Sequence, residues 1–215
     1  MVTSAGARGW THVPELLSAS EIQTVQADCE ALRLLPDEQR RPGDKPHAGT
    51  HHLAELDTRS NLVKDIASSG RLLAAVALFV DPTNTMLRAS YRCPQPGYGA
   101  QKLHTDALPK LDDGPHLVAT AIIALVDFTM TNGSTRVIPG SHARPDLQRH
   151  AGAIDHHDDE HMLTCSAGSA FVFTGHLLHS GTLNELQHPR PALQLQWHAG
   201  GALATEQYHP QLPAG

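Results

Sequence analysis

Paired cysteines, long apolar runs and clusters of basic residues are scarce or missing in this 215-residue sequence. The three cysteines, Cys29, Cys93 and Cys165, are odd in number, far apart and in no CxxC pair, which fits a reducing compartment better than a disulfide framework. No run of about 18 apolar residues exists, and the N-terminus has no apolar core of signal-peptide length. We therefore expect a soluble, cytoplasmic protein with no membrane partner.

Positive charge is scarce as well. Sixteen Lys and Arg residues against twenty-two Asp and Glu residues give a formal net charge of −6, and the longest basic run is Arg40-Arg41. Proteins that bind nucleic acid present a basic surface to the phosphates, so this composition argues against a nucleic-acid partner. A small molecule is the expected partner, and nothing in the sequence indicates an oligomeric state.

The first part of the chain, residues 1–82, has the periodicity of helices. Helices are expected over residues 14–35, 62–66 and 72–80. The first has a capping box in Ser18 and Glu21, and Asp81-Pro82 is expected to end the last. Residues 36–56 are rich in Pro, Gly, Asp and His and predict a loop. We expect residues 1–82 to form a mostly helical buttress.

From residue 86 the apolar pattern has a period of two, which is typical of half-buried strands. Strands are expected over residues 86–92, 101–106, 117–128, 135–138, 162–165, 170–174 and 192–197. Turn signals such as Asn132-Gly133 separate them. Many short strands of this kind predict a mainly β fold with flanking helices, a double-sheet jelly roll whose core covers residues 86–198 of a single domain, 1–215.

The segment Gln101-Lys102-Leu103-His104-Thr105-Asp106 places an imidazole and a carboxylate two residues apart. On a strand, residues i and i+2 point to the same face, so His104 and Asp106 could bind one metal ion. A second histidine would complete the 2-His-1-carboxylate triad of non-haem Fe(II) oxygenases. The chain has sixteen histidines, so spacing rather than abundance must identify that ligand. A His-x-Asp triplet alone is weak evidence, because such pairs are often surface hydrogen bonds.

The candidates for the second histidine are His176 and His179. A spacing of three puts them on opposite faces of a strand, so only one can be a ligand. His179 is favoured because it precedes the Gly-containing turn that leads to Asn184 and Arg190. A strand-turn-strand unit of this length would set Arg190 beside His179, where a planar guanidinium suits a dicarboxylate cosubstrate. The alternative is a surface arginine in a proline-rich turn.

At these residues the sequence resembles the phytanoyl-CoA dioxygenase family of Fe(II)- and 2-oxoglutarate-dependent oxygenases. The likeness runs through ordered blocks at residues 96–106, 126–142 and 179–190. The resemblance implies a double-stranded β-helix (cupin-like) fold and the use of Fe(II), 2-oxoglutarate and O₂. It implies that iron is bound by His104, Asp106 and His179. It implies that 2-oxoglutarate is bound by Arg190, and it matches three further cosubstrate positions to Gln101, Asn184 and Thr135.

The sequence departs from the family pattern in two respects. Many relatives carry a small hydroxyl residue two positions after the second histidine, where this chain has Gly181. The chain is also shorter than the members that act on fatty-acyl-CoA and has no basic patch for a CoA phosphate, which argues against a CoA thioester. Asp106 disfavours halogenation, because the halogenating enzymes of this type lack that carboxylate. We expect hydroxylation or another oxidation of a small metabolite, as in natural product biosynthesis.

Two other interpretations stay open at this point. The first is a cupin-type metalloenzyme that works without 2-oxoglutarate, which would have no need of Arg190. The second is a non-catalytic jelly roll that binds a small molecule. Candidates for the mouth of the pocket are Tyr91, Arg92, Lys102, Leu108, His116 and the segment 40–55.

Overall fold

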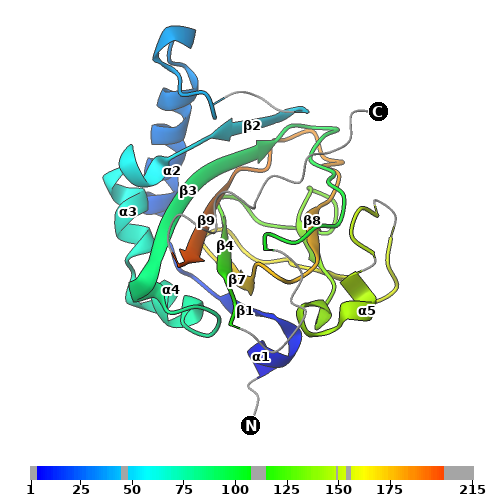
Figure 1. Cartoon of the computed structure of the whole chain (residues 1–215). Coiled ribbons are helices and arrows are strands. Elements are labelled where there is room, and N and C mark those ends of the chain that lie inside the picture. Colours follow the sequence, from blue (N-terminus) through cyan, green and yellow to red (C-terminus); the bar gives the residue numbers. More distant parts are fainter. Residues whose placement is uncertain (1–3, 45–47, 108–114, 149, 154–155, 201–215) are drawn as a thin grey trace.

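The computed structural model describes residues 4–44, 48–107, 115–148, 150–153 and 156–200. Its strands form two antiparallel sheets (Figure 1). The larger sheet has the order β1 (Trp10–Val13), β7 (Ala170–Thr174), β4 (Val118–Ala124), β9 (Ala192–Ala199), β3 (Thr85–Pro94) and β2 (Thr50–Leu53). The smaller sheet has the order β6 (His161–Met162), β5 (Thr135–Val137) and β8 (His179–Gly181). The predicted jelly roll is confirmed.

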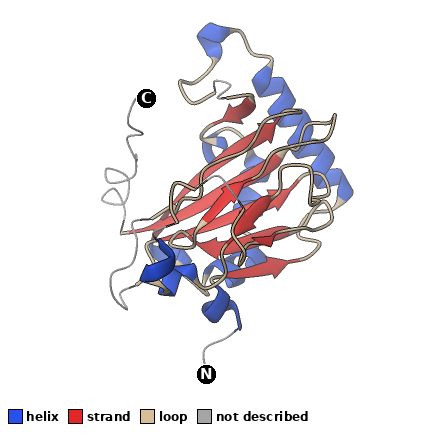
Figure 2. Cartoon of the chain, turned by 90° about the vertical axis from the view of Figure 1, so that its right-hand side faces the viewer, coloured by secondary structure: helices blue, strands red, loops and turns tan. Residues whose placement is uncertain are grey.

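The helices are concentrated in the first part of the chain. They are α1 (Ser4–Arg8), α2 (Ala19–Arg33), α3 (Asn61–Ala67), α4 (Gly70–Val76) and the short α5 (Pro145–Gln148). Figure 2 shows the strands of the larger sheet side by side in one twisted layer, with long loops in front of them. No helix in the described ranges has the length and apolar character needed to cross a membrane.

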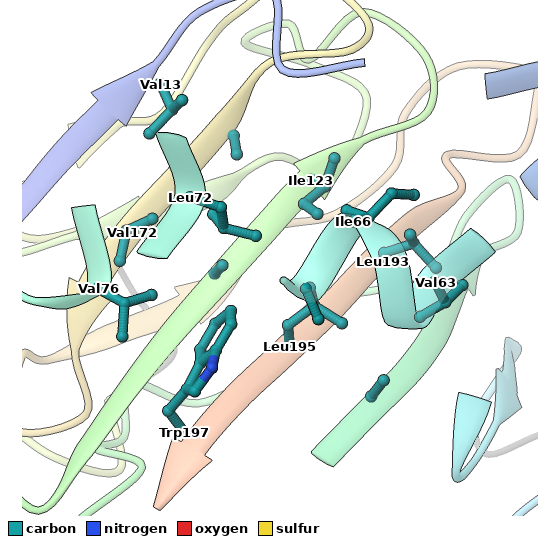
Figure 3. Packing of buried hydrophobic residues seen from close by; sticks show 14 of the residues in the cluster. Val13, Val63, Ile66, Leu72, Val76, Ile123, Val172, Leu193, Leu195 and Trp197 are labelled. Carbon is teal, nitrogen blue, oxygen red and sulfur yellow. The ribbon is translucent and has the colours of Figure 1, made fainter. Parts of the chain in front are cut away.

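Side-chain alternation divides the large sheet into an apolar face and a polar face. On β9, Leu193, Leu195 and Trp197 pack with residues of α2, α3 and α4 in the main hydrophobic core (Figure 3). The residues between them point to the opposite face, where Gln194 lines a cavity. The same alternation on β3 sends Ala89 into the core and Arg92 into that cavity. The cavity therefore lies on the face away from the helices.

Most of the predicted elements are present. Helix α2 begins with the expected capping box, in which the Ser18 hydroxyl accepts from the Glu21 N–H and the Glu21 carboxylate accepts from the Ser18 N–H. Helix α4 ends at Val76, before the predicted stop, and Pro82 instead begins a short 3₁₀ turn, Pro82–Asn84. The expected strand over residues 101–106 is wrong, because His104 makes only an isolated bridge.

The first part of the chain is more than a helical buttress. It supplies β1 and β2, which form the two edges of the large sheet, and β2 lies inside the segment predicted to be a loop. Each of these strands has four residues, too few to show a clear period of two. They are held by pairing with β7 and β3, far away in the sequence. The local pattern contains no sign of these partners.

His198 is a polar group buried on the cavity face of β9. Its side chain is 2% exposed, and neither ring nitrogen has a hydrogen-bond partner among the described residues. Burial, together with nearby Arg88, holds the pKa of His198 below its ordinary value of 6.5. The folded protein therefore binds this proton less readily than the unfolded chain does. Protonation of His198 in the unfolded chain therefore leaves stability unchanged above about pH 6.5 and lowers it as the pH falls below that value.

We expect His198→Leu to raise the free energy of unfolding at neutral pH by about 1–2 kcal/mol, because an unsatisfied buried polar group is removed. Between about pH 7.5 and pH 5.5 the variant should also lose less stability than the wild type. Urea unfolding across this range measures both effects. The control is His188→Leu, because the exposed His188 stays in water in both states. An identical pH dependence in His198→Leu and wild type would contradict the assignment.

Candidate metal centre and cosubstrate pocket

His104, Asp106 and His179 come together between the two sheets. One potential ligand atom from each lies within 4.8 Å of the others, and no other such group of His, Cys, Asp or Glu occurs among the described residues. The Nε2 atom of His179 is 3.6 Å from Oδ1 of Asp106, and the two imidazole centroids are 4.4 Å apart. The structure thus assembles the three residues that the sequence singled out.

The backbone orients both histidines. The peptide groups of His104 and His179 exchange two hydrogen bonds, of 3.0 and 2.9 Å, which join the loop carrying His104 to the start of β8. The Nδ1 atom of His104 lies 2.8 Å from the carbonyl oxygen of Lys102, and that of His179 lies 3.0 Å from the carbonyl oxygen of Leu177. Because a carbonyl only accepts, each Nδ1 carries the proton and each Nε2 keeps its lone pair for a metal.

Asp106 is oriented by two neighbouring strands. Its Oδ2 accepts from the Thr120 hydroxyl of β4 at 2.5 Å and from the Gln196 amide of β9 at 2.9 Å. Burial alone would raise the pKa of Asp106, but His179, His104 and these hydrogen bonds outweigh it and hold the pKa below the ordinary value. Burial lowers the pKa of His179. A charged carboxylate and a neutral imidazole are the states that metal binding requires.

Arg190 lies at the edge of the same cavity, just before β9. It is 6% exposed, and its guanidinium carbon is 4.7 Å from the centroid of the Phe128 ring. Its Nε has no hydrogen-bond partner, and the described residues offer its guanidinium no carboxylate. Burial and nearby Arg92 lower the pKa of Arg190 to about 10, so it stays charged at neutral pH. The alternative of a surface arginine is therefore wrong.

Other cavity-lining residues include Gln101, Thr135, Gly181, Arg92 and Gln194. The Gly181 N–H donates to Oε1 of Gln101 at 3.1 Å. This bond identifies the oxygen of the Gln101 amide and leaves its NH₂ group for a ligand. Thr135, on β5, is paired with Gly181 on β8. Gln101 and Thr135 thus face the space between the triad and Arg190.

Asn184 does not line the cavity. It is fully buried, and its amide nitrogen donates to the carbonyl of His188 at 2.8 Å. Its amide oxygen accepts from the N–H of Leu186 at 3.2 Å. These bonds hold the turn between β8 and β9, which leads into Arg190. Asn184 therefore positions the arginine, in place of the predicted contact with a cosubstrate.

His176 lies outside the triad. It is 1% exposed, in the turn between β7 and β8, and its Nε2 accepts from the N–H of Leu117 at 3.2 Å. Of the expected mouth residues, Arg92 lines the cavity, Tyr91 packs against the core on the helical face, and Leu108 lies outside the described residues. Thr120 and Gln196, which bind the Asp106 carboxylate, are not marked by any local pattern in the sequence.

We expect Thr120→Val to weaken Fe(II) binding by about tenfold or more, because the Asp106 carboxylate loses the hydroxyl that orients it. Equilibrium dialysis of Fe(II) under argon measures the affinity. Thr174→Val is the matched control, because Thr174 is equally buried and its hydroxyl contacts His116, outside the triad. Equal Fe(II) affinities in both variants would show that Thr120 has no part in orienting the ligand.

Comparison with known proteins finds relatives that are described as dioxygenases. The family profile described as Phytanoyl-CoA dioxygenase (PhyH) matches residues 7–192. Dioxygenase trt7 of Aspergillus terreus is 34% identical over 154 residues, which are 67% of this chain and 52% of that protein. The Fe(II)/2-oxoglutarate-dependent dioxygenase nvfF of Aspergillus novofumigatus is 35% identical over 97 residues, 41% of this chain and 30% of that protein. The chain spans about half the length, or less, of the curated relatives it matches.

Solved structures share the fold. The 2-oxoglutarate-dependent epimerase SnoN from nogalamycin biosynthesis aligns with a TM-score of 0.71 at 20% identity, covering 100% of this chain and 90% of that one. HygX from Streptomyces hygroscopicus, with nickel and 2-oxoglutarate bound, aligns with a TM-score of 0.72 at 15% identity, covering 92% of this chain and 85% of that one. These likenesses confirm the double-stranded β-helix. With a family match across almost the whole described structure, the chain belongs to the phytanoyl-CoA dioxygenase (PhyH) family.

Proposed function

We propose that the chain is a non-haem Fe(II)- and 2-oxoglutarate-dependent oxygenase that oxidises a small metabolite. The observation that carries this proposal is one cavity in which a 2-His-1-carboxylate triad faces a buried arginine that has no acidic partner among the described residues. Two neutral imidazoles and one carboxylate fit Fe(II) and leave positions open for a cosubstrate. When bound, iron and 2-oxoglutarate would supply the oxidising chemistry, in which O₂ is consumed and 2-oxoglutarate is converted to succinate and CO₂.

Arg190 is the residue that we assign to the far carboxylate of 2-oxoglutarate. A buried cation without an anion is unfavourable, so the site is built for a negatively charged ligand. A guanidinium binds a carboxylate through two parallel hydrogen bonds, and Asn184 holds the turn that leads to this arginine. A cupin enzyme that works without 2-oxoglutarate would have no use for this buried charge.

Gln101 and Thr135 complete the proposed cosubstrate site. The free NH₂ group of Gln101 and the hydroxyl of Thr135 are donors on the wall of the cavity. The structure gives a steric reason for Gly181, which stands where many relatives carry a small hydroxyl residue. A Cβ at that position would lie 2.8 Å from the carbonyl oxygen of Gly99 and 3.0 Å from Oε1 of Gln101. No hydroxyl side chain fits there, so donors elsewhere on the wall must take over the contact.

The similar proteins support a small-molecule substrate. SnoN belongs to nogalamycin biosynthesis, and HygX has been solved with hygromycin B bound. We propose that this chain likewise acts on a metabolite of natural-product type. Hydroxylation is the outcome we favour, since Asp106 occupies the position that halogenating enzymes leave open. The three cysteines are free in the structure, in keeping with the cytoplasmic location that we propose.

The metal assignment predicts a sharp difference between two buried histidines. His104→Ala, Asp106→Ala and His179→Ala should each lose stoichiometric Fe(II) binding and 2-oxoglutarate turnover, because three ligands form one set. His176→Ala removes an imidazole of equal burial and should keep both properties. Anaerobic iron titration and succinate release measure them. Retention of iron in His179→Ala, with loss in His176→Ala, would reverse the assignment.

Variants of Arg190 distinguish cosubstrate binding from metal binding. Arg190→Lys keeps the charge but loses the two-pronged geometry, so 2-oxoglutarate should bind about ten- to a hundred-fold more weakly, the equivalent of roughly 1.5–3 kcal/mol. Arg190→Ala should be weaker still, and Fe(II) affinity should change little in either variant. Anaerobic titration, followed by the metal-to-ligand charge-transfer band, measures the affinity. Wild-type affinity in Arg190→Ala would remove this residue from the site and revive the cupin interpretation.

A further inference from the structure

Arg92 is a second cation of the cavity, and the proposed reaction leaves it without a role. We propose that Arg92 binds an anionic group of the primary substrate, so that the enzyme selects a small acid carrying one negative charge, such as a carboxylate. This inference rests on the proposed function and deepens it by naming the class of substrate.

The position of Arg92 suits an incoming ligand. It lies near the end of β3 on the cavity face, opposite Ala192 on β9, and it lines the cavity together with the triad. In the part of the chain that the structure describes, its guanidinium makes no hydrogen bond or ion pair. The small side chain of Ala192 leaves room in front of it. Arg92 is therefore a donor with five N–H groups and no acceptor among the residues that the structure describes.

The net charge of the cavity, with Fe(II) and 2-oxoglutarate bound, favours an anionic substrate. Among the described lining residues, the ionised groups are Asp106, Arg190 and Arg92. In the proposed complex, Asp106 and the near carboxylate of 2-oxoglutarate would neutralise Fe(II), and the far carboxylate would neutralise Arg190. The nearby thiol of Cys93 adds no charge, because burial raises its pKa. One positive charge, that of Arg92, remains, and a guanidinium keeps its charge even when it is buried. A singly charged substrate would neutralise it.

The cosubstrate is a poorer candidate for this arginine than the primary substrate. The far carboxylate of 2-oxoglutarate has the more deeply buried Arg190, and its near carboxylate would be neutralised by the metal. Arg92 is partly exposed, as is Gln194, which lines the same cavity from β9, where it is paired with Ser90. Both therefore lie toward the open side of the cavity, through which a substrate enters. The Gln194 amide adds a neutral donor beside the guanidinium.

Benzoate and benzamide test the inference, because they have the same shape and differ in charge. Each is titrated by calorimetry, without oxygen, into the protein loaded with Fe(II) and saturated with 2-oxoglutarate. We expect the wild type to bind benzoate about tenfold or more tightly than benzamide, the effect of one charge-assisted pair. Arg92→Gln should lose this preference, and Arg92→Lys should keep part of it. Arg88→Gln is the control, because Arg88 is an exposed arginine on the same face of β3.

Several outcomes would overturn the inference. They are equal affinity of the wild type for the two probes, the absence of saturable benzoate binding, and an undiminished preference in Arg92→Gln. A loss of 2-oxoglutarate affinity in Arg92→Gln, by about tenfold or more, would assign Arg92 to the cosubstrate instead. Failure of the proposed function looks different, because the wild type would then form no charge-transfer band with Fe(II) and 2-oxoglutarate.

Discussion

The site depends on the two backbone hydrogen bonds between His104 and His179. They join a loop to the first residue of β8 and bring the two histidines, 75 positions apart in the sequence, face to face. Each ring is then turned by a carbonyl two residues earlier in its own segment. The direction of both imidazoles therefore follows from backbone geometry. A segment without regular structure of its own can carry two ligands because this bridge holds it against the smaller sheet.

The large sheet separates two environments by alternation alone. Successive residues of β9 contribute in turn to the core under the helices and to the cavity between the sheets. The apolar residues supply the stability of the sheet, since their burial removes hydrocarbon surface from water. This leaves the polar face free to hold charged groups, whose partners we propose to be ligands. Gln196 connects the sheet to the triad, because it belongs to a central strand and donates to Asp106.

The cavity holds more positive charge than its protein groups neutralise. Arg190 and Arg92 both have a lowered pKa because burial disfavours their charge. Unpaired buried cations destabilise a fold, and they gain their partners only when anions bind. We therefore expect cosubstrate and substrate to stabilise the protein as well as react in it. Among the described residues neither arginine forms an ion pair with a carboxylate, and such a carboxylate would compete with the ligand.

Local patterns in the sequence were sufficient to predict the longer helices and strands. The capping box of α2 and the alternation of Leu87, Ala89 and Tyr91 with polar residues on β3 concern neighbouring residues, so propensity and periodicity reveal them. The order His104, Asp106, His179, Arg190, together with the family resemblance, was enough to select residues that the structure brings to one cavity. The alternation of β3 also marked Arg92 as facing away from the apolar core.

The tertiary structure alone decided the rest. The edge strands β1 and β2 are too short for a period to show, and they form because distant strands offer hydrogen-bond partners. Thr120 and Gln196 contact Asp106 from 14 and 90 residues away, and neither side chain differs from any other polar residue of a strand. The burial of Arg190 and the inward turn of Asn184 likewise depend on how the sheets close. Sequence determined which chemical groups are present, whereas packing determined which of them meet, because contacts between distant strands leave no local pattern.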